Sequence, residues 1–184
     1  PLSAGTLSFS EACKVTNSND VNRVVPVAAS TLKQIRTNLF AVTANGKILL
    51  DGNMAQFSRS WSNEVDIKDG IKLNNTGENL GLARNSKTLV VERRALIQNT
   101  DTLFYKIGQV KVQQYELQFI PANLQEPGLV AYLEDSYLNT SRVVSLHDTT
   151  RIQFNIINVP GSYATDRFRL VFRQGKVRAQ QPVA

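Results

Sequence analysis

The sequence has very few of the residues that build disulfides, metal centres and catalytic sites. Cys13 is the single cysteine and His147 the single histidine among 184 residues. One cysteine cannot form an internal disulfide, and these two residues can hardly supply the ligands of a zinc site. His147 has no serine elbow or cysteine beside it, so nothing indicates a nucleophilic triad. The composition therefore disfavours a disulfide scaffold, a zinc module and a Ser–His hydrolase.

Long apolar runs and phosphate-binding loops are also missing. No apolar run approaches the ~20 residues that a membrane-spanning helix needs, so we do not expect the chain to span a membrane. The ten glycines are scattered, mostly at turns, and do not form a loop that cradles phosphate. Since the chain starts at Pro1 and shows no signal peptide, we expect a fragment of a longer protein or a processed product.

The formal charge is +6, but the basic residues are not clustered. Arg93-Arg94 is the only adjacent basic pair, and elsewhere Arg and Lys alternate with apolar residues, as in Arg167-Phe-Arg169. A nucleic-acid-binding protein would gather them on one element, so we expect no nucleic-acid partner. The basic residues then form the solvated face of a sheet, or they weakly attract anionic polysaccharide.

What the sequence does contain is short runs of alternating apolar and polar residues. The clearest are Tyr115–Ile120, Arg151–Ile157 and Arg167–Phe172. Period two is the pattern of a half-buried strand, because successive side chains point to opposite faces. Further strands are expected over residues 88–97, 102–107 and 110–120, and over 38–42 and 48–50 as a hairpin with an Asn-Gly turn. Residues 31–42 also lie near helical spacing, but the hairpin is favoured.

Short strands separated by regular turn signals, without a convincing helix, predict an all-β fold. We expect an antiparallel β-sandwich of jelly-roll type over residues 31–173. Residues 1–30 are expected to form an N-terminal arm or edge strands, and residues 174–184 a C-terminal linker. Phe57 and Trp61 are expected to anchor the core.

Several short segments carry a further signal as an ordered set. They are Ser62–Asp66 with Asp69, Glu78–Leu82, Leu89–Arg94, Asp101–Leu103, Pro127–Leu129, Tyr132–Tyr137 and Asp166–Phe172. Together they resemble the β-sandwich region near the C-terminus of surface proteins that the type IX secretion system of Bacteroidota exports. The resemblance covers more than half of the chain. It implies a secreted or cell-surface location and no reaction, because members of this group are mostly uncharacterised and adhesin-like.

Tyr132–Tyr137 places two aromatic residues beside two carboxylates. The structural interpretation is that Glu134 or Asp135 pairs with an arginine, with Arg167 and Arg169 as the natural candidates. The functional interpretation is a sugar-binding edge, in which Trp61, Tyr132 and Tyr137 stack on pyranose rings.

Two kinds of modification or ion site are also candidates. Calcium takes hard oxygen ligands from polar loops, and four acidic residues lie in such loops: Glu64, Asp66, Asp69 and Glu78. Their spacing does not match an EF-hand, and solvated carboxylates in Asx-turns are the alternative. Thr102 and Thr149 follow aspartates in the short Asp-Thr pattern that Bacteroidota use for O-glycosylation.

These observations favour a non-catalytic structural or adhesive module of a bacterial secreted or surface protein. It would assemble with itself or with other surface proteins, for example as a subunit of an extracellular fibre in which an N-terminal arm adds a strand to a neighbour. The alternative is a carbohydrate-binding module of a secreted multidomain protein, with polysaccharide as its partner. An enzyme ranks third, because nothing selects a catalytic pair among the carboxylates.

Overall fold

The protein is described from a computed structural model, in which residues 31–175 are placed. Residues 32–175 belong to one compact unit. The expected N-terminal arm with Cys13, and residues 176–184 of the expected linker, lie outside the described residues.

Eleven strands and one short 3-10 helix make up the described part of the chain. They are β1 (Lys33–Thr43), β2 (Gly46–Phe57), β3 (Gly70–Ile71), β4 (Asn79–Arg84), β5 (Lys87–Arg94), β6 (Thr102–Gly108), β7 (Gln114–Ala122), β8 (Leu129–Asp135), β9 (Thr140–Val144), β10 (Thr150–Asn155), η3 (Pro160–Tyr163) and β11 (Phe168–Gln174).

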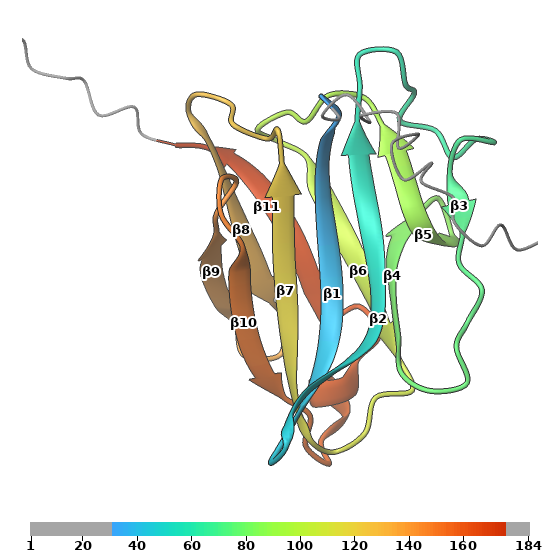
Figure 1. Ribbon diagram of the computed structural model, residues 1–184, viewed down its shortest axis with the longest axis vertical. Coiled ribbons are helices and arrows are strands. Elements are labelled where there is room, and N and C mark those ends of the chain that lie inside the picture. The colour runs from blue at the N-terminus through green and yellow to red at the C-terminus, as the bar shows by residue number, and fades with distance from the viewer. Residues whose placement is uncertain (1–30, 176–184) are drawn as a thin grey trace, which may run out of the picture. The chain divides into compact units, whose positions relative to one another are not determined.

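The strands form one sheet in the order β10-β7-β1-β2-β5-β4-β6-β11-β8-β9, with β3 paired to β5 beside this path. The sheet curls until it is nearly closed into a barrel (Figure 1). Residues of β8, β9 and β10 line one small pocket, so the two end strands of the path come close together. The expected all-β fold is confirmed.

The sheet is mixed and continuous, where the sequence predicted an antiparallel sandwich. The difference arises at β5, which pairs in parallel with β2 through Met54↔Val91 to Phe57↔Arg94. Because β5 also pairs with β4, it joins two antiparallel halves into a single sheet. The period-two pattern of a strand does not reveal the direction of its neighbour, so the sequence could not predict this junction.

The predicted hairpin is confirmed, and the helical alternative for residues 31–42 is wrong. β1 and β2 pair along their whole length, with Thr43 opposite Gly46 and Ala44-Asn45 between them. Gly46 has φ 121°, a backbone conformation that L side chains rarely adopt, so glycine is required here. A bulge between Leu39 and Phe40 shifts the register, and bulges increase the local twist of a sheet.

Other elements also differ from the prediction, and β7 and β4 are two examples. β7 begins at Gln114, so the expected strand over residues 110–120 is wrong at its start and Val112 is exposed. The backbone N–H of Lys111 instead donates to the Tyr115 hydroxyl at 2.8 Å, which turns the chain before β7. β4 was not predicted, because the polar residues Glu78 and Asn79 at its start read as part of a loop. Its residues Leu80 and Leu82 are fully buried.

The inward faces of the strands form one hydrophobic core with some polar groups inside it. Tyr105 and Phe119 meet edge to face at 6.1 Å, and Phe154 stacks on Tyr115 at 5.6 Å. The hydroxyl of Tyr105 shares a hydrogen bond of 2.8 Å with that of Thr37 on β1. Burial raises the pKa of Tyr105, so this hydroxyl keeps its proton. Phe57 is buried as expected, whereas Trp61 is only half-buried.

Within residues 31–175, the structure has no helix of the length and apolar character needed to cross a membrane.

Candidate functional site

A groove of about 580 Å³ lies on the outer face of the sheet, where β6, β11, β8 and β9 are neighbours. Phe104, Arg169, Glu134 and Ser141 line it, together with Asn139 and Asp166 from the adjoining turns. Among the grooves of residues 31–175, this one combines an exposed aromatic ring with several polar side chains. We therefore treat it as the candidate site.

The strand register explains why these residues meet. Phe104 on β6 is opposite Arg169 on β11, Arg169 is opposite Glu134 on β8, and Glu134 is opposite Ser141 on β9. Residues directly opposite each other share a face of the sheet and have Cβ atoms only about 5 Å apart. Four strands thus contribute one outward side chain each to a single row across the sheet.

Phe104 is the apolar member of this row. Its neighbours Leu103 and Tyr105 are buried on the inner face, and alternation therefore turns Phe104 outward, where its side chain is 50% exposed. The sequence contained this signal, because two adjacent aromatic residues on one strand must face opposite sides. The sequence analysis did not use it, and Phe104 was missed.

The carboxylate of Glu134 is held between two arginines. Its Oε2 accepts a hydrogen bond of 2.7 Å from Arg169 Nε, and its Oε1 accepts one from Arg173 Nη2. Both arginines are more than half exposed, so the pairs add little to stability, typically about 0–1 kcal/mol each. Their effect is to orient the side chains and to neutralise Glu134.

A buried ion pair lies beneath the groove. Arg167 is 1% exposed and donates from Nε and Nη2 to the two carboxylate oxygens of Asp135, at 2.9 and 2.7 Å. Its Nη1 donates to the carbonyl oxygens of Asn155 and Ser162. The predicted pairing of Glu134 and Asp135 with Arg167 and Arg169 is therefore confirmed, and it fixes the floor of the site.

The three aromatic residues predicted to bind sugar do not line the groove. Tyr132 lies on the same face, one row away between Val171 and Val143, with the Arg173 guanidinium 5.5 Å from its ring. Tyr137 is covered by the guanidinium of Arg167 at 5.0 Å. Trp61, in the loop after β2, has the Arg93 guanidinium 5.6 Å from its ring.

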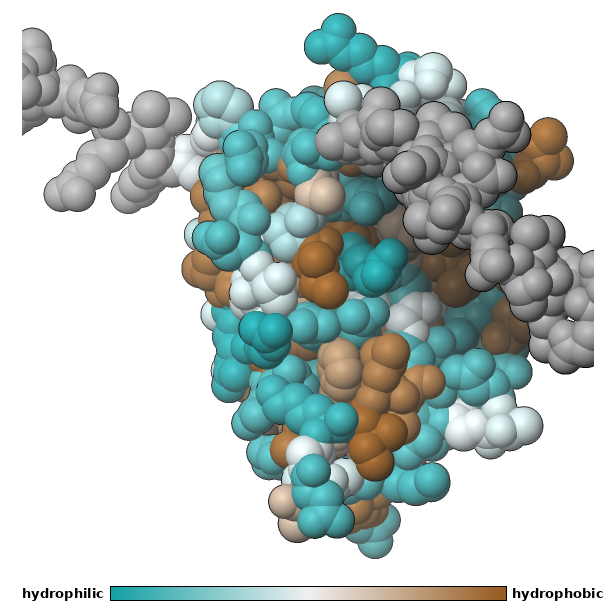
Figure 2. All heavy atoms as spheres, viewed as in Figure 1, coloured by the Kyte–Doolittle hydropathy of each residue, from teal (hydrophilic) through white to brown (hydrophobic). Residues whose placement is uncertain are grey.

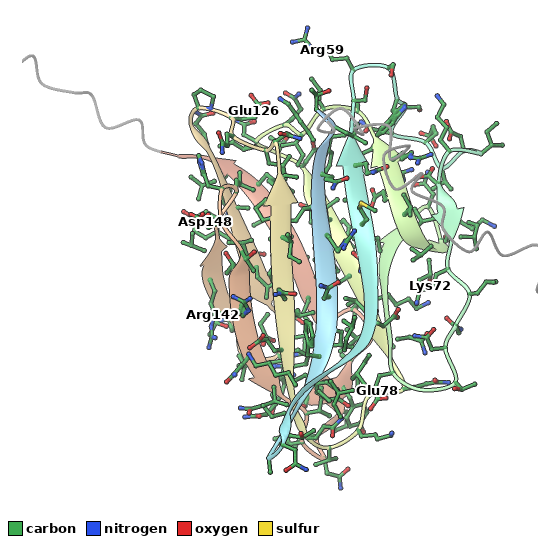
Figure 3. All side chains as sticks on the ribbon, viewed as in Figure 1. Arg59, Lys72, Glu78, Glu126, Arg142 and Asp148 are labelled. Atoms are coloured by element: carbon green, nitrogen blue, oxygen red, sulfur yellow. The ribbon has the colours of Figure 1, made fainter. Side chains whose placement is uncertain are left out.

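The four candidate calcium ligands are not gathered around one point. Asp69 instead accepts hydrogen bonds from Arg84 Nη2 and the Arg93 backbone N–H, at 2.8 and 2.7 Å. Glu78 accepts from the Tyr115 hydroxyl at 3.2 Å, and Figure 3 places it at the lower end of the sheet, away from Arg59 in the loop after β2. Glu64 and Asp66 are exposed. Among residues 31–175 no three acidic, histidine or cysteine side chains are grouped to hold a metal ion.

The two threonines predicted to carry glycans lie in different surroundings. Thr102 begins β6 and is half-buried beside Val171, while Thr149 is exposed in the loop between β9 and β10. The aspartates before them are also held differently. Asp101 accepts from Arg94 Nη2 at 2.9 Å and from the Gln98 N–H, and the turn at Asp148 is held by the Ser145 hydroxyl.

A second ionic cluster is buried on the inner face and was missed by the sequence analysis. Glu92 Oε1 accepts from Arg84 Nη1 at 3.1 Å and from Arg94 Nη1 at 3.4 Å. Burial raises the pKa of Glu92, because desolvation outweighs the attraction of Arg94 and Arg84. Its second carboxylate oxygen is buried without a hydrogen bond among the described residues. Nothing in an alternating strand pattern distinguishes such a residue from a solvated one.

Comparisons of the chain with models of protein families, with curated proteins and with solved structures found no match. The groove presents an aromatic ring, hydroxyls, an amide and neutralised charges, which suit binding through stacking and hydrogen bonds.

Proposed function

We propose that this chain is a non-catalytic structural and adhesive module of a bacterial secreted or cell-surface protein. The observation that supports this most directly is the way its shielded carboxylates are used. Asp135, Glu116, Glu92 and Asp51 each meet an arginine or lysine of another segment. The pairs of Asp135, Glu116 and Asp51 join segments that are far apart in the sequence, and the pair of Glu92 joins β5 to β4, the strand before it.

Such carboxylates suit a mechanical role better than a chemical one. Glu116 on β7 meets Lys47 on β2 at 2.5 Å, and Asp51 on β2 meets Lys72 after β3 at 2.6 Å. A general acid or base must come within hydrogen-bond reach of its substrate. A buried carboxylate that already accepts from a cation is poorly placed for that, whereas breaking such a pair destabilises a fold strongly.

The outer surface also offers an area for association with other proteins. A second groove, of about 420 Å³, is lined by apolar residues of β2 and β5, among them Leu49, Met54 and Val90, and by polar residues such as Arg36 and Asp51. Ile48 and Leu49 near the tip of the β1–β2 hairpin are 56% and 58% exposed. Figure 2 shows hydrophobic side chains gathered over the lower part of the face formed by β1 and β2. Exposed apolar patches of this kind are typical of interaction surfaces.

The resemblance to type IX-exported proteins supports the extracellular location. It is also compatible with the jelly-roll-like sandwich predicted from the sequence, in which β1 with its neighbours and β6 with its neighbours would act as two facing layers. The hydrogen bond between Thr37 on β1 and Tyr105 on β6 joins these two halves across the core.

The test uses the full chain in two measurements. Electron microscopy with light scattering determines whether it forms filaments or binds a surface-protein extract, and panels of glycosides, esters and peptides are assayed for hydrolysis. We expect assembly or adhesion without turnover. Turnover that disappears when one carboxylate is replaced, with the fold intact, would overturn the proposal.

A second candidate function, carbohydrate binding, is favoured by the groove that contains Phe104. It is compatible with an adhesive module, since many adhesive contacts are made to glycans.

A further inference from the structure

We propose that the groove between Phe104 and Ser141 binds a neutral oligosaccharide, an inference that rests on the adhesive function proposed above and names its ligand. The argument has four parts: the ring, the hydrogen-bonding groups, the balance of charge and the rigidity of the floor.

The ring of Phe104 provides a stacking platform. It is half exposed on a strand whose neighbouring apolar side chains are buried, and it is one of the lining residues of the groove. Ligand sites combine an apolar or aromatic surface with a few well-placed polar groups. The C–H face of a pyranose ring packs on an aromatic ring in the same way, burying apolar surface that is otherwise wet.

The remaining lining offers donors and acceptors in the mixture that sugar hydroxyls need. Ser141 is exposed at the far end of the row, Asn139 lies in the turn before β9 with φ 52°, and Asp166 is exposed before β11. A sugar hydroxyl both donates and accepts, so it is best matched by hydroxyl, amide and carboxylate groups together. Arg169 adds guanidinium donors beside the ring.

The charge of the groove favours a neutral ligand over an anionic one. Arg169 and Arg173 share the carboxylate of Glu134, and Arg167 is bound to Asp135. The third carboxylate, Asp166, balances the charge of the third arginine, so the groove is close to neutral rather than basic. Phosphate, sulfate and uronic acid groups require an excess of cationic donors, which these pairs remove. The alternative of attraction to anionic polysaccharide therefore does not apply to this groove.

The dimensions suit more than one sugar ring. Three strand spacings separate Phe104 from Ser141, which amounts to about 14 Å across the sheet. A chain of sugars running across the strands would contact the platform at one end and the polar groups at the other.

The floor is rigid before the ligand arrives. Arg167 is fixed by its two bonds to Asp135 and its two bonds to backbone carbonyls, and its guanidinium lies 4.8 Å from the ring of Phe168. A pre-organised site loses less conformational entropy on binding, which favours affinity for a flexible oligosaccharide.

The experiment uses the full chain and an array of neutral hexasaccharides of glucose, mannose, galactose and xylose, followed by calorimetry with the best binder. We expect Phe104→Ala to weaken binding about tenfold or more, and Phe104→Tyr to retain it. Tyr163→Ala is the matched control, because Tyr163 is an aromatic residue of η3 that is 42% exposed and does not line the groove. Thermal melting of each variant verifies the fold.

The outcomes separate this inference from the proposed function. Binding that is lost in Phe104→Ala, retained in Tyr163→Ala and insensitive to salt supports the inference. No binding in the millimolar range, equal binding by both alanine variants, or a strong dependence on salt overturns it, and leaves the adhesive function standing if assembly or adhesion persists. Hydrolysis of the bound saccharide would overturn the non-catalytic function instead.

Discussion

Arg167 and Asp135 form a buried, two-bond ion pair that joins the chain before β11 to the end of β8. The guanidinium is also surrounded by aromatic rings, with centroids of Tyr137, Phe154 and Phe168 at 4.8 to 5.2 Å. Arg167 is only 1% exposed, so its guanidinium is held by these protein groups rather than by solvent. Because losing one partner would leave the other as an uncompensated buried charge, breaking this pair is expected to destabilise the fold strongly.

Replacing Arg167 with Gln is expected to lower the free energy of unfolding by about 3–5 kcal/mol, because Asp135 would keep a buried charge without its partner. Urea denaturation of both proteins measures the change. Arg169→Gln is the control, since it breaks the exposed pair with Glu134 and should cost at most about 1 kcal/mol. If both variants lost the same free energy of unfolding, the buried ion pair would contribute no more to stability than the exposed one.

This pair was predictable from the sequence, and its buried counterpart at Glu92 was not. Arg167–Phe172 is a clear strand pattern, and Tyr132–Tyr137 contains two adjacent carboxylates, so residues of opposite charge could be matched before the structure was known. Glu92 sits in a strand that also reads as alternating, yet its neighbour β2 runs parallel to it. The cation partners of Glu92 are Arg84 and Arg94, and Arg84 belongs to β4, a strand that the sequence did not predict.

The hydrogen bond between the hydroxyls of Thr37 and Tyr105 lies inside the core, and its contribution to stability can be measured by removing either hydroxyl. Tyr105→Phe and Thr37→Val should each lower the free energy of unfolding by about 1–3 kcal/mol, because each leaves a buried hydroxyl without its partner. The double variant should lose about 1 kcal/mol less than the sum of the two. Denaturation of the four proteins in a double-mutant cycle checks this, and strict additivity would show that the two hydroxyls do not interact.

Because the pKa of Glu92 is raised in the folded protein, we expect the free energy of unfolding to depend on pH. Its native pKa lies above that of the unfolded chain because of burial, so in the interval between the two values the native state binds more protons. Stability from this residue is therefore full below about pH 4.5, the ordinary value for glutamate, and falls as the pH rises through the raised value. The slope is at most about 1.4 kcal/mol per pH unit.

Comparison with Glu92→Gln isolates this contribution. The free energy of unfolding of the wild type minus that of the variant should decrease with pH across this interval and then become constant. Glu64→Gln, which removes an exposed carboxylate, is the control for the loss of a negative charge. If the free energy of unfolding of the wild type minus that of the variant rose with pH, the attraction of the arginines would outweigh burial in setting the pKa of Glu92.

More of the fold than of the candidate site could be predicted from the sequence. Alternation and turn residues located most of the long strands, since those depend on local chemistry. The groove depends on which strands become neighbours: Phe104 meets Arg169 only because β6 lies beside β11, and Ser141 joins them only through β9. The pattern of a strand predicts which face of the sheet a side chain lies on. The order of the strands in the sheet determines which side chains are its neighbours.

Gly81 on β4 provides a test of the close packing around β5. A Cβ atom placed on Gly81 would lie 2.5 Å from Thr88 Cγ2 and 3.3 Å from the Leu89 carbonyl oxygen, so Gly81→Ala must push β4 and β5 apart or twist Thr88. We expect a loss of about 1–3 kcal/mol, the usual cost of overpacking. Gly77, in the turn before β4, has nothing within 4 Å of the same atom. Gly77→Ala should therefore be neutral or stabilise by up to about 1 kcal/mol, through the unfolded chain. If thermal and urea denaturation gave the same change for both variants, β4 would not be packed against β5 as closely as the structure has it.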